Sequence, residues 1–117
     1  MMKKLWNRIF KSKEMREYWK MYKRHRKTMI KLAKEDRDWD FGYLHDFVVT
    51  KIKHMYEFYC AGNNIWQSEE SLKQILETLA HAIDLAEKIH NSGIYAESKL
   101  YEEFYTYIGQ NIQYWWD

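Results

Sequence analysis

The sequence of 117 residues contains no proline, four glycines and a single cysteine. Proline and glycine interrupt helices most strongly, so their scarcity favours an all-α fold. The lone thiol, Cys60, excludes a disulfide within the chain and is most simply a small buried side chain. No apolar run approaches the roughly 18 residues of a membrane-spanning helix, and the basic start lacks a secretory signal. We therefore expect one domain, residues 1–117, in the cytoplasm and without a membrane span.

The signature motifs of catalysis and metal binding are also missing. The chain has no P-loop, no G-x-G-x-x-G, no G-x-S-x-G and no H-E-x-x-H. Glu87 and His90 form one E-x-x-H pair, whereas carboxylate-bridged di-iron bundles use two such pairs. We therefore expect no catalytic residues, no metal and no cofactor, and we predict that the protein is not an enzyme.

Charge is unevenly distributed along the chain. Residues 1–34 hold thirteen Lys or Arg against two Glu, a net charge of +11, and the remaining residues carry −9. The overall charge of +2 therefore conceals a basic N-terminal region and an acidic body. Such a region can lie on the acidic body of its own or a neighbouring chain, bind a polyanion, or touch an anionic membrane surface.

Apolar residues recur at the i, i+3, i+4 spacing of an amphipathic helix in four stretches. They predict a basic N-terminal helix at about 5–34 and core helices at about 40–60, 69–91 and 95–115. Ser68 followed by Glu69 and Glu70 marks the start of one core helix, and Gly93 marks its end. The short connections favour an antiparallel bundle of the three core helices within 40–117, with the basic helix docked on it or extended from it.

The segment at 36–47 contains four aspartates and four aromatic residues. Asp38 or Asp40 is the expected N-cap of the helix at 40–60, because aspartate accepts hydrogen bonds from the first main-chain N–H groups of a helix. Unpaired N–H groups at a helix start also favour an anion. Three further side chains lie at this helix start and are candidates for the rim of a site: Arg37, Trp39 and Tyr43.

Lys51 interrupts the apolar face of the same predicted helix, and His54 follows one turn later on the same side. The lysine can simply extend its ammonium group into water. Alternatively, it lines a pocket for a ligand whose phosphates pair with cations and whose bases stack on aromatic rings. The residues predicted to meet the phosphates are Arg26, Arg37, Lys51 and His54. The residues predicted to stack on the bases are Trp39, Tyr43 and Tyr56.

The basic helix is itself a candidate for binding. Trp6, Trp19 and Tyr22 lie among its cations, a mixture that suits long nucleic acid, although the acidic body would repel the same phosphate backbone. The helix can equally be solvated and paired with acidic neighbours, and its first dozen residues can lie on a membrane surface.

Three short motifs link the sequence to a known group of proteins. They are W-D-x-x-Y-L (Trp39, Asp40, Tyr43, Leu44), K-x-x-x-M (Lys51, Met55) and W-W-D (Trp115, Trp116, Asp117). In these motifs the sequence resembles small all-helical bacteriophage accessory proteins. The resemblance implies the cytoplasm of an infected bacterium and action by stoichiometric binding, either to a host defence protein or to a nucleotide signal that such a defence uses.

We therefore expect a non-enzymatic phage binding protein that antagonises host immunity by sequestering an anionic nucleotide-like signal, as a homo-oligomer. One alternative is a protein that masks a host defence effector, such as a CRISPR nuclease, by mimicking nucleic acid or covering an interface. A third possibility is a nucleic-acid-binding module that acts through the basic N-terminal helix.

Overall fold

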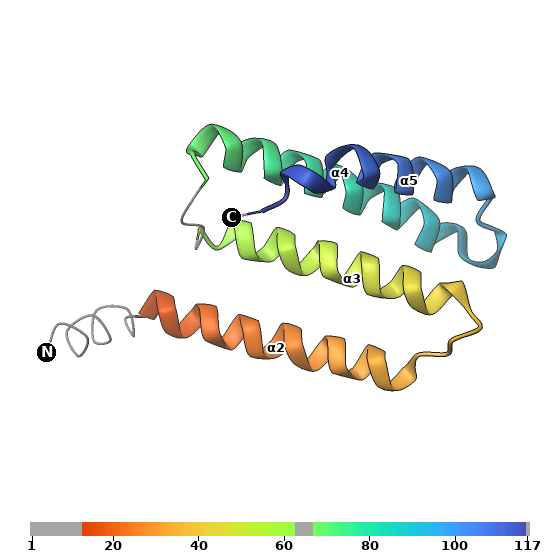
Figure 1. Ribbon diagram of the computed structural model, residues 1–117, viewed down its shortest axis with the longest axis horizontal. Helices are drawn as coiled ribbons and strands as arrows, with labels where there is room; N and C mark the ends of the chain where they lie inside the picture. The colour runs from red at the N-terminus through yellow and green to blue at the C-terminus, as the bar shows by residue number, and fades with distance from the viewer. Residues whose placement is uncertain (1–12, 63–66, 117) are drawn as a thin grey trace, which may run out of the picture. The chain divides into compact units, whose positions relative to one another are not determined.

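The computed structural model describes residues 13–62 and 67–116, which are helical and contain no strand (Figure 1). The elements are α2 (Lys13–Glu35), α3 (Phe41–Cys60), α4 (Glu69–Ser92), η1 (Gly93–Tyr95), α5 (Ser98–Asn111) and η2 (Ile112–Tyr114). The prediction of an all-α helical bundle is confirmed. Over the described residues, no helix is both long and apolar enough to cross a membrane.

The chain divides into two compact units, and the boundary lies inside α3. The N-terminal unit, Met1–Phe47, contains α2 and the first residues of α3. The C-terminal unit, Val48–Asp117, contains the rest of α3 and all of α4 and α5. The C-terminal unit contains two of the three predicted core helices in full and most of the third. The cluster of buried hydrophobic residues lies in this unit.

The core of the C-terminal unit is built around α4. Leu79 and Ala82 on α4 and Phe104 on α5 are completely buried, and Ile52 and Tyr59 on α3 belong to the same cluster. The buried residues of α4 recur every three or four positions, as an amphipathic helix requires. They are Ile75, Leu79, Ala82, Leu85, Ala86 and Ile89. Successive helices of this unit run in opposite directions, as predicted from their short connections (Figure 1).

The ends of α4 follow the sequence signals closely. The Ser68 hydroxyl accepts a hydrogen bond from the Ser71 main-chain N–H at 3.2 Å, which caps the start of the helix. Gly93 follows the last residue of α4 with a φ of 57°, a left-handed value that favours glycine. The predicted boundaries of this helix, 69–91, therefore differ from the observed ones by a single residue.

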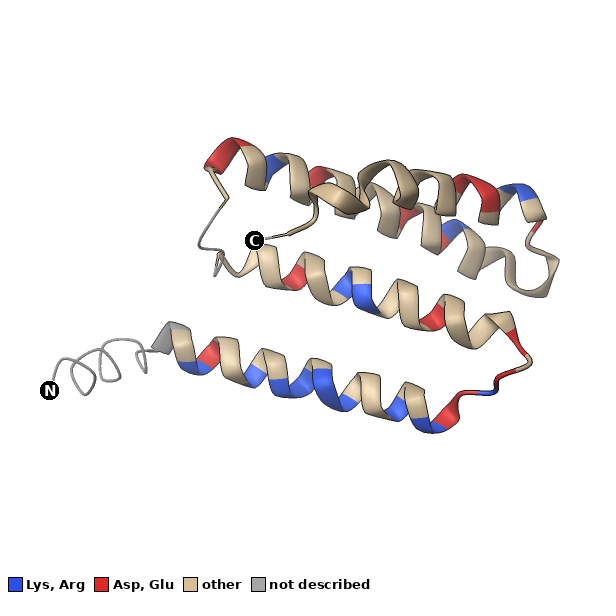
Figure 2. Cartoon of the chain, viewed as in Figure 1, with Lys and Arg blue, Asp and Glu red and all other residues tan. Residues whose placement is uncertain are grey.

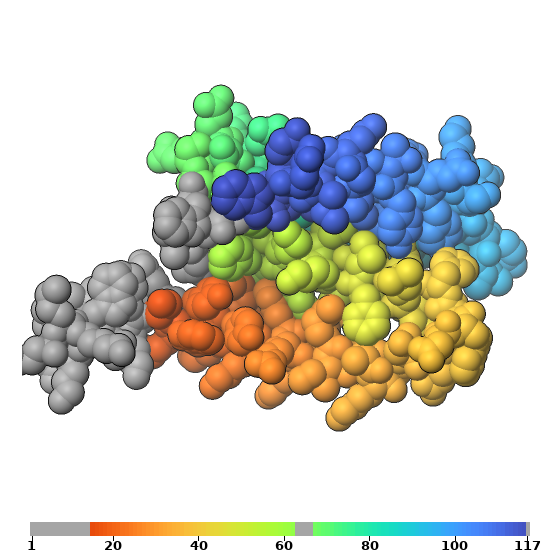
Figure 3. Space-filling model, in the orientation of Figure 1, coloured from red at the N-terminus to blue at the C-terminus, as the bar shows by residue number. Residues whose placement is uncertain are grey.

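The predicted helix at 95–115 is shorter than expected. Helix α5 begins at Ser98 and ends at Asn111, with short 3₁₀ turns before and after it. The chain then leaves the helical path at Trp115, which is buried and whose indole Nε1–H donates to the Thr78 hydroxyl on α4 at 2.8 Å. This long-range contact favours an early end to the helix. The segment that follows α5 lies at the surface in the space-filling view (Figure 3).

In the N-terminal unit, Asp40 is the residue that caps α3. Its carboxylate oxygen Oδ1 accepts a hydrogen bond from the Gly42 main-chain N–H at 2.8 Å. Of the two aspartates predicted for this role, the structure therefore selects Asp40 over Asp38. The predicted helix at 5–34 corresponds to α2, which starts at Lys13 and ends at Glu35, and residues 1–12 lie outside the described part of the chain.

Candidate functional site

Helix α2 presents a dense array of cations to solvent. Every Lys and Arg between positions 15 and 35 is exposed, and we call these eight residues the α2 basic surface (Figure 2). They are Arg16, Lys20, Lys23, Arg24, Arg26, Lys27, Lys31 and Lys34. Only Glu17 and Glu35 carry negative charge in the same stretch. At about 1.5 Å per residue, the surface extends roughly 27 Å along the helix.

An aromatic cluster lies on the same helix among these cations. Trp19 packs edge-to-face against Tyr18, with ring centroids 5.5 Å apart, and against Tyr22 at 5.6 Å. Trp19 and Tyr22 are 48% and 41% exposed, so their rings remain accessible. The Arg26 guanidinium carbon lies 6.0 Å from the centroid of the Tyr22 ring, within cation–π distance. The α2 aromatic cluster, Tyr18, Trp19 and Tyr22, therefore places ring surface next to positive charge.

The structure divides the seven predicted ligand-binding residues between the two units. The N-terminal unit holds Arg26, Arg37, Trp39 and Tyr43, and the C-terminal unit holds Lys51, His54 and Tyr56. Within the N-terminal unit, Arg26 lies nine residues before the end of α2, or roughly 14 Å along the helix axis. It is therefore separate from the residues that follow α2.

The segment after α2 has a local structural role that the sequence did not reveal. The Arg37 guanidinium Nη1 donates to the carbonyl oxygens of Glu35 at 3.1 Å and Asp36 at 2.9 Å. These bonds satisfy main-chain acceptors where the helix ends, so part of the hydrogen-bonding capacity of Arg37 is already used. Trp39 is 82% exposed beside it, and Tyr43 is half-buried.

On α3, two of the three predicted residues share a side of the helix. Lys51 is exposed and His54 is half-buried one turn further along. Tyr56 lies about 200° around the helix from His54 and about 140° from Lys51, so it faces another direction. A hydrogen bond with the Cys60 thiol raises the pKa of Tyr56 above its ordinary value. Cys60 is exposed, so the interpretation of a buried thiol was wrong.

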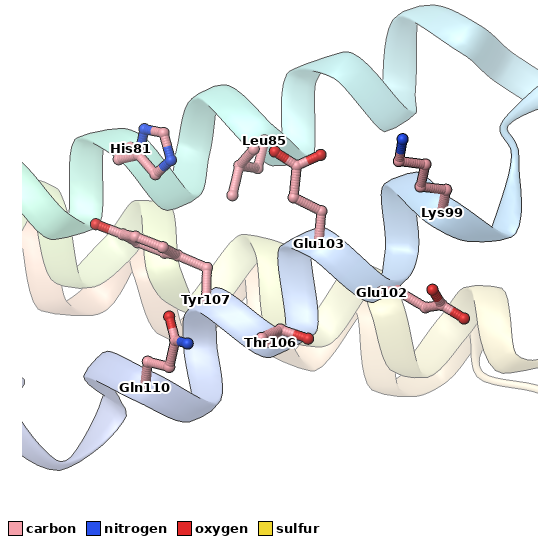
Figure 4. A pocket seen from close by; sticks show the side chains of 8 residues that line it. All are labelled: His81, Leu85, Lys99, Glu102, Glu103, Thr106, Tyr107 and Gln110. Atoms are coloured by element: carbon pink, nitrogen blue, oxygen red, sulfur yellow. The ribbon is translucent and has the colours of Figure 1, made fainter.

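A groove between α4 and α5, with a volume of about 410 Å³, was not predicted (Figure 4). The rings of His81 and Tyr107 meet in it edge-to-face at 4.5 Å, and burial raises the pKa of Tyr107. Lys99 is its single lysine, against the carboxylates of Glu102 and Glu103. This excess of negative charge disfavours a phosphate ligand. None of the seven predicted residues lines this groove.

A smaller cavity, which we call the C-terminal pocket, lies between the start of α4 and the segment after α5. Its volume is about 200 Å³. The residues that line it are Gln67, Ser71, Gln74, Ile75, Thr78, Asn111, Tyr114 and Trp116, none of which is charged. In the sequence, the W-W-D motif marks Trp116, one of these lining residues, but does not reveal a pocket. None of the seven predicted residues lines this pocket either.

The described residues also contain no group of three His, Cys, Asp or Glu side chains placed to hold a metal ion. No protein-family model matches the chain, and no curated protein or solved structure matches it either.

Proposed function

We propose that the protein is a non-enzymatic binding protein whose α2 surface holds a single-stranded nucleic acid or a similar chain of nucleotides. The observation that carries this proposal is the combination, on one helix, of eight exposed cations with an exposed aromatic cluster. Cations offset the charge of phosphates, and base rings stack on tryptophan and tyrosine. Helix α2 therefore offers cations to the phosphate of a nucleotide and aromatic rings to its base.

The length of the basic surface favours an extended ligand over a single nucleotide. Its cations are spread over roughly 27 Å, so one small signal molecule would leave most of them unpaired. A single strand also fits better than a duplex, because its bases are free to stack on Trp19 and Tyr22. Of the three expected functions, the geometry therefore supports nucleic-acid binding through the basic helix best.

The charge of the two units supports the same assignment. The N-terminal unit has fourteen basic and seven acidic residues, a net charge of +7, and the C-terminal unit has five basic and ten acidic residues, a net charge of −5. A negatively charged unit repels phosphate. Binding should consequently depend on α2 and be insensitive to the lysines of the C-terminal unit.

The resemblance to phage proteins supplies a biological setting for the proposal. In an infected cell, the protein would act by stoichiometric capture, holding a nucleic acid or nucleotide signal of host immunity and releasing it unchanged. A homo-oligomer would multiply the number of α2 surfaces available to one strand. The oligomeric state stays a prediction that size-exclusion chromatography with light scattering can measure.

Charge reversal tests the proposal directly. The variant Arg24→Glu/Lys27→Glu/Lys31→Glu alters α2, and Lys73→Glu/Lys88→Glu/Lys99→Glu makes the same charge change in the C-terminal unit. Fluorescence anisotropy would measure binding of a labelled oligothymidylate of about 20 nucleotides. This length exceeds the roughly 4–16 nucleotides that one single-strand-binding domain typically covers. We expect the α2 variant to bind about 100-fold more weakly, and the matched control less than about threefold, at equal salt.

Salt dependence gives a second measure in the same assay. The logarithm of the binding constant should fall linearly with the logarithm of the salt concentration, with a slope of about −0.7 per phosphate contact. The slope should be shallower in the α2 variant. Equal losses in both triple variants, or binding that ignores salt, would contradict the proposal. Tighter binding of AMP than of the oligonucleotide would instead favour sequestration of a small signal.

Stacking is tested by comparing two exposed tryptophans of the N-terminal unit. Trp19→Ala removes a ring of the α2 aromatic cluster, and Trp39→Ala removes a ring that belonged to the site predicted from sequence. A stacked base is worth about 1–3 kcal/mol, so Trp19→Ala should weaken oligonucleotide binding about 5- to 150-fold. We expect Trp39→Ala to bind like the unmodified protein. The reverse order of effects would place the site at the start of α3.

A further inference from the structure

The C-terminal pocket differs in chemistry from the charged groove between α4 and α5. Its lining combines three side-chain amides, two hydroxyls, one isoleucine and two aromatic rings, with no charged group among them. Its volume of about 200 Å³ is below the 300–1,000 Å³ typical of pockets for drug-sized ligands. The pocket is therefore large enough for one small ring system, and the described residues that line it supply no counter-charge for an ionic ligand.

Two hydrogen bonds hold the walls of this pocket in place. The indole of Trp115, which is only 6% exposed, donates to the Thr78 hydroxyl at 2.8 Å, and this anchors the segment after α5 against α4. The Gln67 amide nitrogen donates to the carbonyl oxygen of Trp116 at 2.6 Å. Because these contacts are made within the chain, the walls need little ordering when a ligand enters.

Several groups of the lining are available to a ligand. The rings of Tyr114 and Trp116 are 56% and 59% exposed. The Gln74 side chain is exposed and lines the pocket. The Asn111 amide nitrogen donates to the Tyr107 carbonyl oxygen at 2.9 Å, which leaves its own oxygen as an acceptor. The pocket thus offers flat aromatic surface together with neutral donors and acceptors.

This combination identifies a class of ligand. Flat heterocycles stack on tryptophan and tyrosine, and the paired donor and acceptor of a glutamine or asparagine amide match the N6 and N7 edge of adenine. Among the described lining residues, phosphates and ammonium groups would find no partner of opposite charge. We propose that the C-terminal pocket binds an uncharged purine ring, with Trp116 as the stacking surface and Gln74 as the reader of the base edge.

The proposal does not depend on binding by α2. Adenosine carries no phosphate to pair with the α2 cations, and oligothymidylate lacks a purine. The indole signals of Trp116 and Trp19 report separately on the C-terminal pocket and on α2. Failure of one proposal is therefore distinguishable from failure of the other.

Titration of the full chain with adenosine, followed by ¹H–¹⁵N NMR, provides the test. The indole N–H of Trp116 and the side-chain amides of Gln74 and Asn111 should shift together, while the indole N–H of Trp19 stays unchanged. Trp116→Ala should weaken adenosine binding about 5- to 150-fold. Gln74→Ala should weaken it about tenfold, and Gln113→Ala, an exposed glutamine outside the lining, should leave it unchanged.

Each other outcome overturns the proposal. A response to N-acetylglucosamine but not to adenosine would assign the pocket to a sugar, since sugars also pack on tryptophan. Shifts with adenosine that persist in both Trp116→Ala and Gln74→Ala would place the binding elsewhere. The absence of any shift at millimolar adenosine would show that the pocket has no affinity for the base.

Discussion

The two units differ in where several of their large aromatic side chains lie. In the C-terminal unit, the aromatic residues Tyr59, Phe104 and Trp115 are buried in the core. In the N-terminal unit, Trp19, Trp39 and Phe41 are exposed. A composition rich in aromatic residues therefore indicates neither a large core nor a large binding surface until their positions are known. The contrast places the buried aromatic core in the C-terminal unit, and the binding that we propose for α2 would use exposed rings of the N-terminal unit.

The largest expected effect comes from making one substitution in both units. Phe104→Ala removes a ring with no exposed surface, and such truncations cost about 3–5 kcal/mol of unfolding free energy. Phe41→Ala removes a ring that is 68% exposed and should cost less than about 1 kcal/mol. Urea denaturation followed by circular dichroism measures both values. Similar losses would show that the N-terminal unit contributes as much packing as the core.

The next effect concerns the hydrogen bond that anchors Trp115. Thr78→Val preserves the shape of the side chain but leaves the buried indole N–H without its acceptor, at a cost of about 1–3 kcal/mol. Thr106→Val, at an exposed position of α5, is the matched control and should change stability by less than about 0.5 kcal/mol. If the Thr78→Val protein were as stable as the control, the Trp115 indole N–H would be donating its hydrogen bond to water in place of Thr78.

A smaller effect is expected at the helix cap of the N-terminal unit. Asp40→Ala removes the acceptor for the Gly42 N–H and should cost about 1 kcal/mol. Asp38→Ala removes a neighbouring exposed carboxylate that does not cap the helix, so its cost should be less than about 0.5 kcal/mol. The same denaturation assay distinguishes them. Equal effects would indicate that the negative charge of the segment matters more than the cap.

The smallest effect is electrostatic. The Lys53 ammonium lies 2.9 Å from the Glu87 carboxylate, and their hydrogen bond holds the pKa of Glu87 below its ordinary value. With a folded-state pKa below the unfolded one, this stabilisation is present above the unfolded pKa and is lost as pH falls through the folded pKa. Lys53→Met should raise the pKa of Glu87 in an NMR titration, whereas Lys51→Met should not. An unchanged pKa would show that the pair is not formed in solution.

Local signals in the sequence predicted most of the fold. The serine cap and the closing glycine fixed α4 to within one residue, because both act through neighbouring main-chain atoms. The early end of α5 was not predictable in this way. It is favoured by the bond between Trp115 and Thr78, which lie 37 positions apart in the sequence. Periodicity alone carries no information about such a contact.

The candidate site was harder to predict for a related reason. The spacing of Tyr18, Trp19 and Tyr22 gave the same stripe that a buried helix face would give, so their exposure could not be deduced. Arg37 looked like a phosphate ligand because its hydrogen bonds to the preceding carbonyls leave no trace in the sequence. The C-terminal pocket brings together residues from 67–78 and 111–116, and only the folded chain makes them neighbours.

The hydrogen bond of Trp115 also has a consequence for experiments on dynamics. Its indole proton is buried and bonded, whereas the indoles of Trp19, Trp39 and Trp116 are 48%, 82% and 59% exposed. In deuterium exchange the Trp115 proton should therefore persist longest of these four, and its exchange rate should follow the opening of the contact between α4 and the segment after α5. The exchange rate of the Trp115 indole proton thus reports on local opening of the core, and it can be measured while candidate ligands of α2 are added.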